Sequence, residues 1–154
     1  MSRRGARSAT WSVGVVVALA LSGCARNAEP PSDAARADQT VAVGEPFRLA
    51  HGKTAALAGH DLRIRFERVS DDSRCPGGVQ CVWAGDAHVV LRLTRAGYDA
   101  AVDTVRLTLE PRVARYTGYA IRLEALEPSP RQGVPTKPDD YVATLRVTTG
   151  ADSR

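Results

Sequence analysis

The residues with the greatest chemical potential lie together at positions 71–86, in the stretch DDSRCPGGVQCVWAGD. This stretch contains two cysteines, three carboxylates, one arginine and one of the two tryptophans of the chain. Thiols can form a disulfide or bind a metal, carboxylates can bind calcium, and tryptophan and arginine often anchor a binding partner. The residues singled out as a candidate binding loop are Asp71, Asp72, Ser73, Arg74, Trp83 and Asp86.

The two cysteines of this stretch, Cys75 and Cys81, predict a structural disulfide. The third cysteine of the chain, Cys24, is assigned below to a lipid, so two remain to pair outside the cytoplasm. A Pro-Gly-Gly turn between them can bring their Cα atoms to disulfide distance. A redox-active or zinc-binding thiol pair is the alternative, but five intervening residues do not match the two-residue gap of such sites.

The sequence allows two kinds of metal site. The three carboxylates of the stretch could supply oxygens to calcium, although the spacing of an EF-hand is absent. Zinc or copper could bind the three histidines, His51, His60 and His88, if the fold brings them together. Scattered surface histidines and local roles for the carboxylates are the simpler interpretation, so we predict no metal and no cofactor.

A hydrolase would need an activated nucleophile or two facing carboxylates. Ser73 lacks the context of a nucleophile elbow, and no histidine stands at a motif-defined distance from it. Asp71 and Asp72 are adjacent, so on a strand they would point to opposite faces. A non-enzymatic binding or structural module is therefore the favoured prediction, with a small metal-binding or hydrolytic envelope protein as the alternative.

Local roles can account for the polar residues of the loop. Asp72 and Ser73 could accept backbone N–H bonds, and Arg74 could pair with a neighbouring aspartate. Trp83 is expected to pack under the loop, with its indole N–H bonded to a carbonyl. In a binding module, Trp83, Arg74 and the segment 128–138 would instead contact an envelope protein, a peptide or a glycan if they are exposed.

The block D-S-R-C-P at 72–76, followed by C-V-W-A-G at 81–85, resembles a block in a family of small, mostly uncharacterised bacterial secreted proteins and lipoproteins. The segments G-E-P-F-R-L at 44–49 and Y-V-A-T-L-R-V at 141–147 are similar as well. This resemblance implies a short β-rich domain outside the cytoplasm. It implies no catalytic residue.

The N-terminus has the layout of a bacterial export signal. Arg3, Arg4 and Arg7 precede an apolar run that is too short to span a membrane stably. The run ends in L-S-G-C at 21–24, which resembles a lipobox and implies cleavage before Cys24, a diacylglyceryl thioether on its thiol and an acylated amine. We therefore predict a lipoprotein signal peptide over 1–23, with an ordinary secretory signal as the alternative.

The predicted acyl chains would hold the protein on a membrane effectively permanently. Ala25 follows the cysteine, and in Gram-negative lipoproteins a residue other than aspartate there implies sorting to the outer membrane, facing the periplasm. Residues 24–39 are rich in Ala, Pro, Asp and Ser without an apolar period, which predicts a lipid-anchored flexible tether.

The charge balance argues against a nucleic-acid partner. The chain has 21 basic and 17 acidic residues, but three arginines belong to the predicted leader. The remaining 18 basic and 17 acidic residues leave the mature chain close to neutral and without a basic stripe.

From about residue 40 to residue 150, apolar residues recur with a period of two, which is typical of half-buried strands. Glycines and prolines separate six or seven such runs, at about 41–49, 62–67, 87–93, 105–109, 119–124 and 141–148. This pattern predicts an all-β domain, either an antiparallel β-sandwich or a small barrel, with a local disulfide loop. An α+β fold is the alternative, because 54–58 or 112–116 could form a helical turn. The proline-rich segment 128–138 should be an exposed connection.

Overall fold

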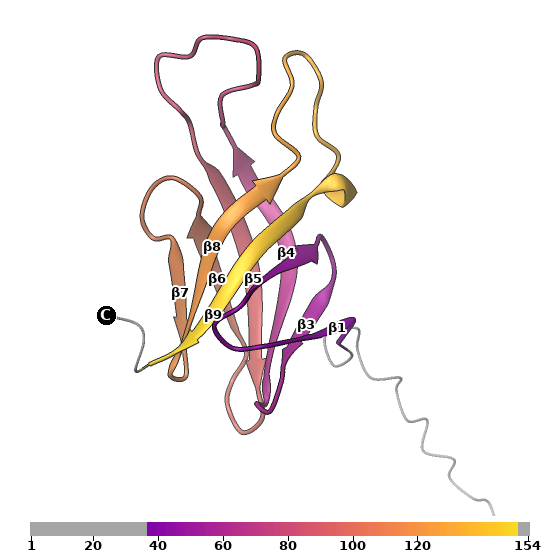
Figure 1. Ribbon diagram of the computed structural model, residues 1–154, viewed down its shortest axis with the longest axis vertical. Coiled ribbons are helices and arrows are strands. Elements are labelled where there is room, and N and C mark those ends of the chain that lie inside the picture. The colour runs from indigo at the N-terminus through magenta and orange to yellow at the C-terminus, as the bar shows by residue number, and fades with distance from the viewer. Residues whose placement is uncertain (1–36, 151–154) are drawn as a thin grey trace, which may run out of the picture. The chain divides into compact units, whose positions relative to one another are not determined.

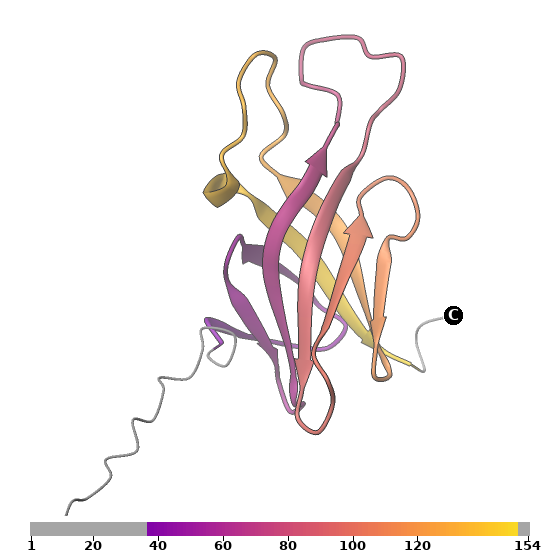
Figure 2. The same ribbon diagram turned by 180° about the vertical axis from the view of Figure 1, so that it is seen from behind.

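The computed structural model describes residues 37–150, which form a sandwich of two β-sheets (Figures 1 and 2). One sheet has five strands in the order β1-β3-β4-β5-β6, and the other has four in the order β2-β9-β8-β7. The sheets pack face to face without closing into a barrel. Of the two predicted architectures, the sandwich is therefore confirmed. The predicted signal peptide, Cys24 and most of the tether lie outside the described residues.

Nine strands build the two sheets. They are β1 (Gln39–Val41), β2 (Pro46–Ala50), β3 (Thr54–Leu57), β4 (Leu62–Asp72), β5 (Ala87–Arg95), β6 (Ala101–Arg106), β7 (Val113–Tyr116), β8 (Tyr119–Glu127) and β9 (Val142–Thr149). Paired strands run antiparallel, except that β1 pairs with β3 in parallel. A single 3-10 turn at Pro138–Asp140 precedes β9, and residues 37–150 contain no α-helix.

The core follows the predicted two-residue alternation. Leu62, Ile64 and Phe66 of β4 are buried, and so are the alternate residues of β5, β8 and β9. Burial of these apolar side chains is the main favourable contribution to folding. Because the whole core lies within 41–147, a fragment of residues 31–154 contains every residue of that core and should fold without the first 30 residues.

The structure excludes the alternative fold class and shifts one expected strand. The segments 54–58 and 112–116 form strands β3 and β7 rather than helical turns, so the α+β alternative is excluded. The strand expected at 105–109 is shifted: β6 runs from Ala101 to Arg106, and Leu109 lies beyond it with a relative exposure of 54%. Regular pairing ends there because the Asp86 carboxylate accepts from the Thr108 N–H and shares the Leu107 N–H with the Ala87 carbonyl of β5.

Three connections lie in the upper half of the sandwich as drawn in Figure 1. They are the β4–β5 loop at 73–86, the β6–β7 loop at 107–112 and the β8–β9 connection at 128–141. The first described strand, β1, lies in the lower half of the same view. The β4–β5 loop therefore projects from the half of the domain opposite the point where the chain enters it.

Candidate binding site at the disulfide loop

The predicted disulfide is present at the tip of the β4–β5 hairpin. Cys75 and Cys81 are bonded, with their Cα atoms 6.0 Å apart. Gly78, at a φ of +84°, helps to reverse the chain between them in a conformation that favours glycine. The bond closes a small ring beyond the last paired residues of β4 and β5.

Below this ring, backbone hydrogen bonds continue the hairpin. The Cys75 N–H donates to the Ala84 carbonyl at 2.9 Å, and the Ser73 N–H donates to the Asp86 carbonyl at 2.8 Å. The Ser73 hydroxyl donates to the same carbonyl and accepts from the Asp86 N–H, both at 3.2 Å. Ser73 is thus used to fasten the loop, as its predicted capping role implies, and its hydroxyl is not paired with a histidine.

Gly85 permits the closest backbone approach in this region. It adopts a φ of +70°, and a Cβ atom there would lie 1.8 Å from the carbonyl oxygen of Ser73. A contact of that length is impossible for any side chain, so the two arms of the loop can meet only at glycine. This is the physical reason for the glycine that ends the C-V-W-A-G segment.

Arg74 and Asp72 lie inside the molecule. Their side chains are 10% and 11% exposed and form an ion pair with an N–O distance of 2.7 Å. The Arg74 guanidinium also donates to the carbonyls of Leu126 and Pro128, and the Tyr141 hydroxyl donates to Asp72 at 2.9 Å. Arg74 therefore ties the end of β4 to the β8–β9 connection. The predicted pairing of Arg74 with a neighbouring aspartate is confirmed, and the alternative contact role required an exposure that the Arg74 side chain does not have.

Electrostatics favour the charged form of Asp72. Burial alone raises the pKa of the Asp72 carboxyl, but hydrogen bonds from Arg74 and Tyr141 outweigh it and hold that pKa below its usual value. The pKa of Tyr141 is raised, first by burial and then by its bond to the Asp72 carboxylate. The pair is built to remain a carboxylate facing a neutral phenol.

Asp86 organises the β6–β7 loop. Its buried carboxylate accepts from the Ala87 and Thr108 N–H groups at 2.8 Å, from the Thr108 hydroxyl at 2.8 Å and from the Arg106 guanidinium at 2.6 Å. Burial alone raises the pKa of Asp86, but these donors more than compensate and hold it far below its usual value. Asp86 is therefore a structural carboxylate.

Trp83 does not pack under the loop, contrary to expectation. Its relative exposure is 77%, and that of Val82 is 100%. Two residues after Trp83, the backbone of Gly85 lies against the backbone of Ser73 with no room for a Cβ atom between them. The two large apolar side chains beyond the disulfide are left to solvent, and sequence reasoning missed Val82 entirely.

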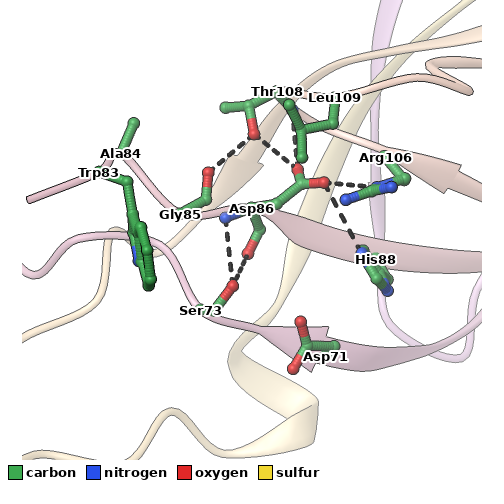
Figure 3. Close-up of a pocket in the computed structure, with 10 residues that line it drawn as sticks. All are labelled: Asp71, Ser73, Trp83, Ala84, Gly85, Asp86, His88, Arg106, Thr108 and Leu109. Atoms are coloured by element: carbon green, nitrogen blue, oxygen red, sulfur yellow. Dashed lines mark hydrogen bonds and ion pairs between the residues drawn. The ribbon is translucent and has the colours of Figure 1, made fainter.

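A shallow groove runs beside Trp83, as Figure 3 shows. Its volume is about 560 Å³, and Trp83 and Leu109 form its apolar sides. Asp71, His88 and Arg106 also line it, and they oppose one another in a row across β4, β5 and β6. His88 points away from the core, as predicted, because Val89 is the buried neighbour on β5.

The proposed metal sites do not form. The calcium hypothesis fails because Asp71 lines the groove while Asp72 and Asp86 are held by the separate sets of donors described above. The three histidines are dispersed. His51 lies 3.1 Å from the Asp139 carboxylate, His60 lies 2.9 Å from the Tyr119 hydroxyl, and His88 lies near Asp86. Within residues 37–150, no group of three or more His, Cys, Asp or Glu residues is placed to bind a metal.

The proline-rich segment 128–138 is an exposed connection, as predicted, and it braces the disulfide loop. The Gly77 N–H donates to the Pro130 carbonyl at 3.1 Å, and Gly77 forms an isolated bridge with Arg131. The two loops stand side by side in Figures 1 and 2. The disulfide ring is thus supported from a second sheet as well as from its own hairpin.

Comparisons with known proteins give no relative: no protein-family model matches the chain, and neither the curated proteins nor the solved structures contain a significant match. In the described part of the chain, no helix has the length and apolarity needed to cross a bilayer.

Proposed function

We propose that this chain is a cell-envelope lipoprotein whose β-sandwich domain is a non-enzymatic binding module, with the disulfide loop as its contact element. One observation carries the proposal. Ser73, Arg74 and Asp86 use their polar groups to brace the loop, whereas Val82 and Trp83 extend into solvent. Exposed aromatic and aliphatic side chains on a rigid frame are typical of the residues that dominate binding energy.

The rigidity of the disulfide loop reduces the conformational entropy that would be lost on binding. The disulfide, the backbone bonds at Ser73 and Cys75 and the brace from Arg74 fix the loop before any partner arrives. Preorganisation of this kind improves affinity without adding contacts. A loop that served only to connect β4 and β5 would not need such reinforcement.

The proposed anchor fits this arrangement. A lipid on Cys24 would tether the chain upstream of β1, and β1 lies in the half of the domain opposite the loops. Replacing Cys24 with alanine should abolish labelling by a fatty-acid analogue and shift the protein from the membrane to the soluble fraction. Continued membrane retention of the C24A protein without label would contradict the lipoprotein assignment.

The contact role can be tested by photo-crosslinking. A photoreactive phenylalanine analogue at position 83 of the 31–154 fragment should capture a discrete envelope component from detergent extracts. The matched control carries the same analogue at Tyr98, which is 56% exposed in the β5–β6 turn at the other end of the sandwich. Serine substitution of Val82 should weaken capture from position 83. Equal products from both positions would contradict the proposal.

A further inference from the structure

We propose that the groove beside Trp83 binds a lysine or arginine side chain of a partner protein, with Asp71 receiving the cationic group. This inference rests on the proposed binding function and names the chemistry of its partner. The charges in the groove do not cancel. Asp86 and Arg106 neutralise one another at an N–O distance of 2.6 Å, and His88 lies 3.7 Å from the same carboxylate oxygen. Among residues 37–150 the Asp71 carboxylate has no hydrogen-bond or ion-pair partner, so the groove has one unbalanced negative charge.

The apolar sides of the groove favour a cation that is attached to a hydrocarbon chain. Trp83 and Leu109 present mainly hydrocarbon surface, with exposures of 77% and 54%. The side chains of arginine and lysine contain three and four methylene groups, which pack along apolar surfaces while the charged group stays at the end. The indole face also attracts a cation electrostatically. A side chain lying between Trp83 and Leu109 would thus meet apolar contacts first and the carboxylate at its end.

Other ligand classes fit less well. An anion would be repelled by the unbalanced charge of Asp71. A wholly apolar group would take water from the Asp71 carboxylate without replacing its hydrogen bonds, which is unfavourable. The cation should belong to a protein rather than to a small amine, because Val82 stands fully exposed next to Trp83, and only an occupant that extends beyond the groove can cover it.

The 31–154 fragment reports on this groove directly. The chain has two tryptophans, Trp11 and Trp83, so Trp83 is the only one in the fragment. The probes are capped tripeptides of the form Gly-X-Gly, in which X is lysine, arginine, norleucine or glutamate. They are titrated to about 50 mM, because a single side chain binds in the millimolar range at best, while Trp83 fluorescence and the Leu109 amide resonance are followed.

The lysine and arginine peptides should give saturable changes at both reporters, and the norleucine and glutamate peptides should not. Asp71→Asn should weaken lysine-peptide binding about fivefold, as expected for one partly exposed ion pair. The matched control is Asp99→Asn, which removes an exposed carboxylate from the β5–β6 turn and should leave the titration unchanged.

Equal responses to lysine and norleucine, or unchanged lysine binding in D71N, would overturn the inference. So would the absence of any peptide response from the folded fragment. The crosslinking from position 83 does not depend on these peptides. A crosslink that persists while lysine selectivity fails would leave the binding function standing with a different partner chemistry, whereas loss of both would remove the binding function too.

Discussion

Replacing Gly85 with alanine should destabilise the domain far more than an ordinary glycine substitution in a loop. The alanine Cβ would lie 1.8 Å from the Ser73 carbonyl oxygen and 2.9 Å from the Cα of Arg74. Both neighbours are backbone atoms, so no flexible side chain can move aside. The two arms of the loop must separate, which breaks the hydrogen bonds that Ser73 and Cys75 donate across it.

Two contributions set the expected loss of unfolding free energy in Gly85→Ala. Holding alanine at a φ of +70° costs about 1–2 kcal/mol relative to glycine. Losing two backbone hydrogen bonds costs about 1 kcal/mol each, which gives a total of about 3–4 kcal/mol. That is a large part of the stability of a domain of this size, for which about 5–15 kcal/mol is usual.

The assay is urea unfolding of the oxidised 31–154 fragment, compared with a matched variant, Gly78→Ala. Gly78 has a similar φ of +84°, but a Cβ there would meet no atom within 4 Å. The G78A variant should therefore lose only the conformational contribution of about 1–2 kcal/mol. Equal losses in G85A and G78A would show that the close approach at Gly85 is not what shapes the loop.

Three further predictions concern the frame of the loop. Arg74→Ala should lower the free energy of unfolding by about 3–5 kcal/mol, because it removes the ion-pair partner of the mostly buried Asp72 carboxylate. The same change at exposed Arg131 should alter it by less than about 0.5 kcal/mol, and similar losses in the two variants would argue against an internal brace. Stability should decrease as the pH falls below 3.8, the ordinary pKa of aspartate, because the folded-state pKa values of Asp72 and Asp86 lie below it. Urea midpoints measured across this range should fall less steeply in Asp86→Asn than in the unsubstituted fragment, and parallel slopes would contradict the role given to Asp86. Replacing both loop cysteines with serine should cost about 2 kcal/mol, as expected for a ring of this size, and calorimetry that finds no change in Tm would refute a stabilising disulfide.

The sequence was sufficient to predict the fold class because the signal is repeated along the chain. The alternation in β4, β5, β8 and β9 places apolar residues on one face, and the observed burial follows it. Short strands such as β3 and β7 contain too few residues for a period to be distinguished from a helical turn. Their state is decided by pairing with β4 and β8, which lies outside the local sequence.

The candidate site was predicted in composition but not in arrangement. The disulfide followed from a count of cysteines, whereas the carbonyls of Leu126 and Pro128 that Arg74 donates to are more than 50 positions away and left no local signal. The sequence predicts an interior Trp83 because buried tryptophan with a bonded indole is common. The exposure of Trp83 and the close approach at Gly85 become visible only when the register of β4 and β5 is known.

The exposure of Trp83 is the claim on which the binding role depends, and quenching of its fluorescence by acrylamide measures that exposure directly. In the oxidised 31–154 fragment, the native state should show emission typical of a water-exposed indole and a quenching constant close to that of the urea-unfolded chain. Blue-shifted emission with weak quenching in the native state would place the indole under the loop and contradict the account.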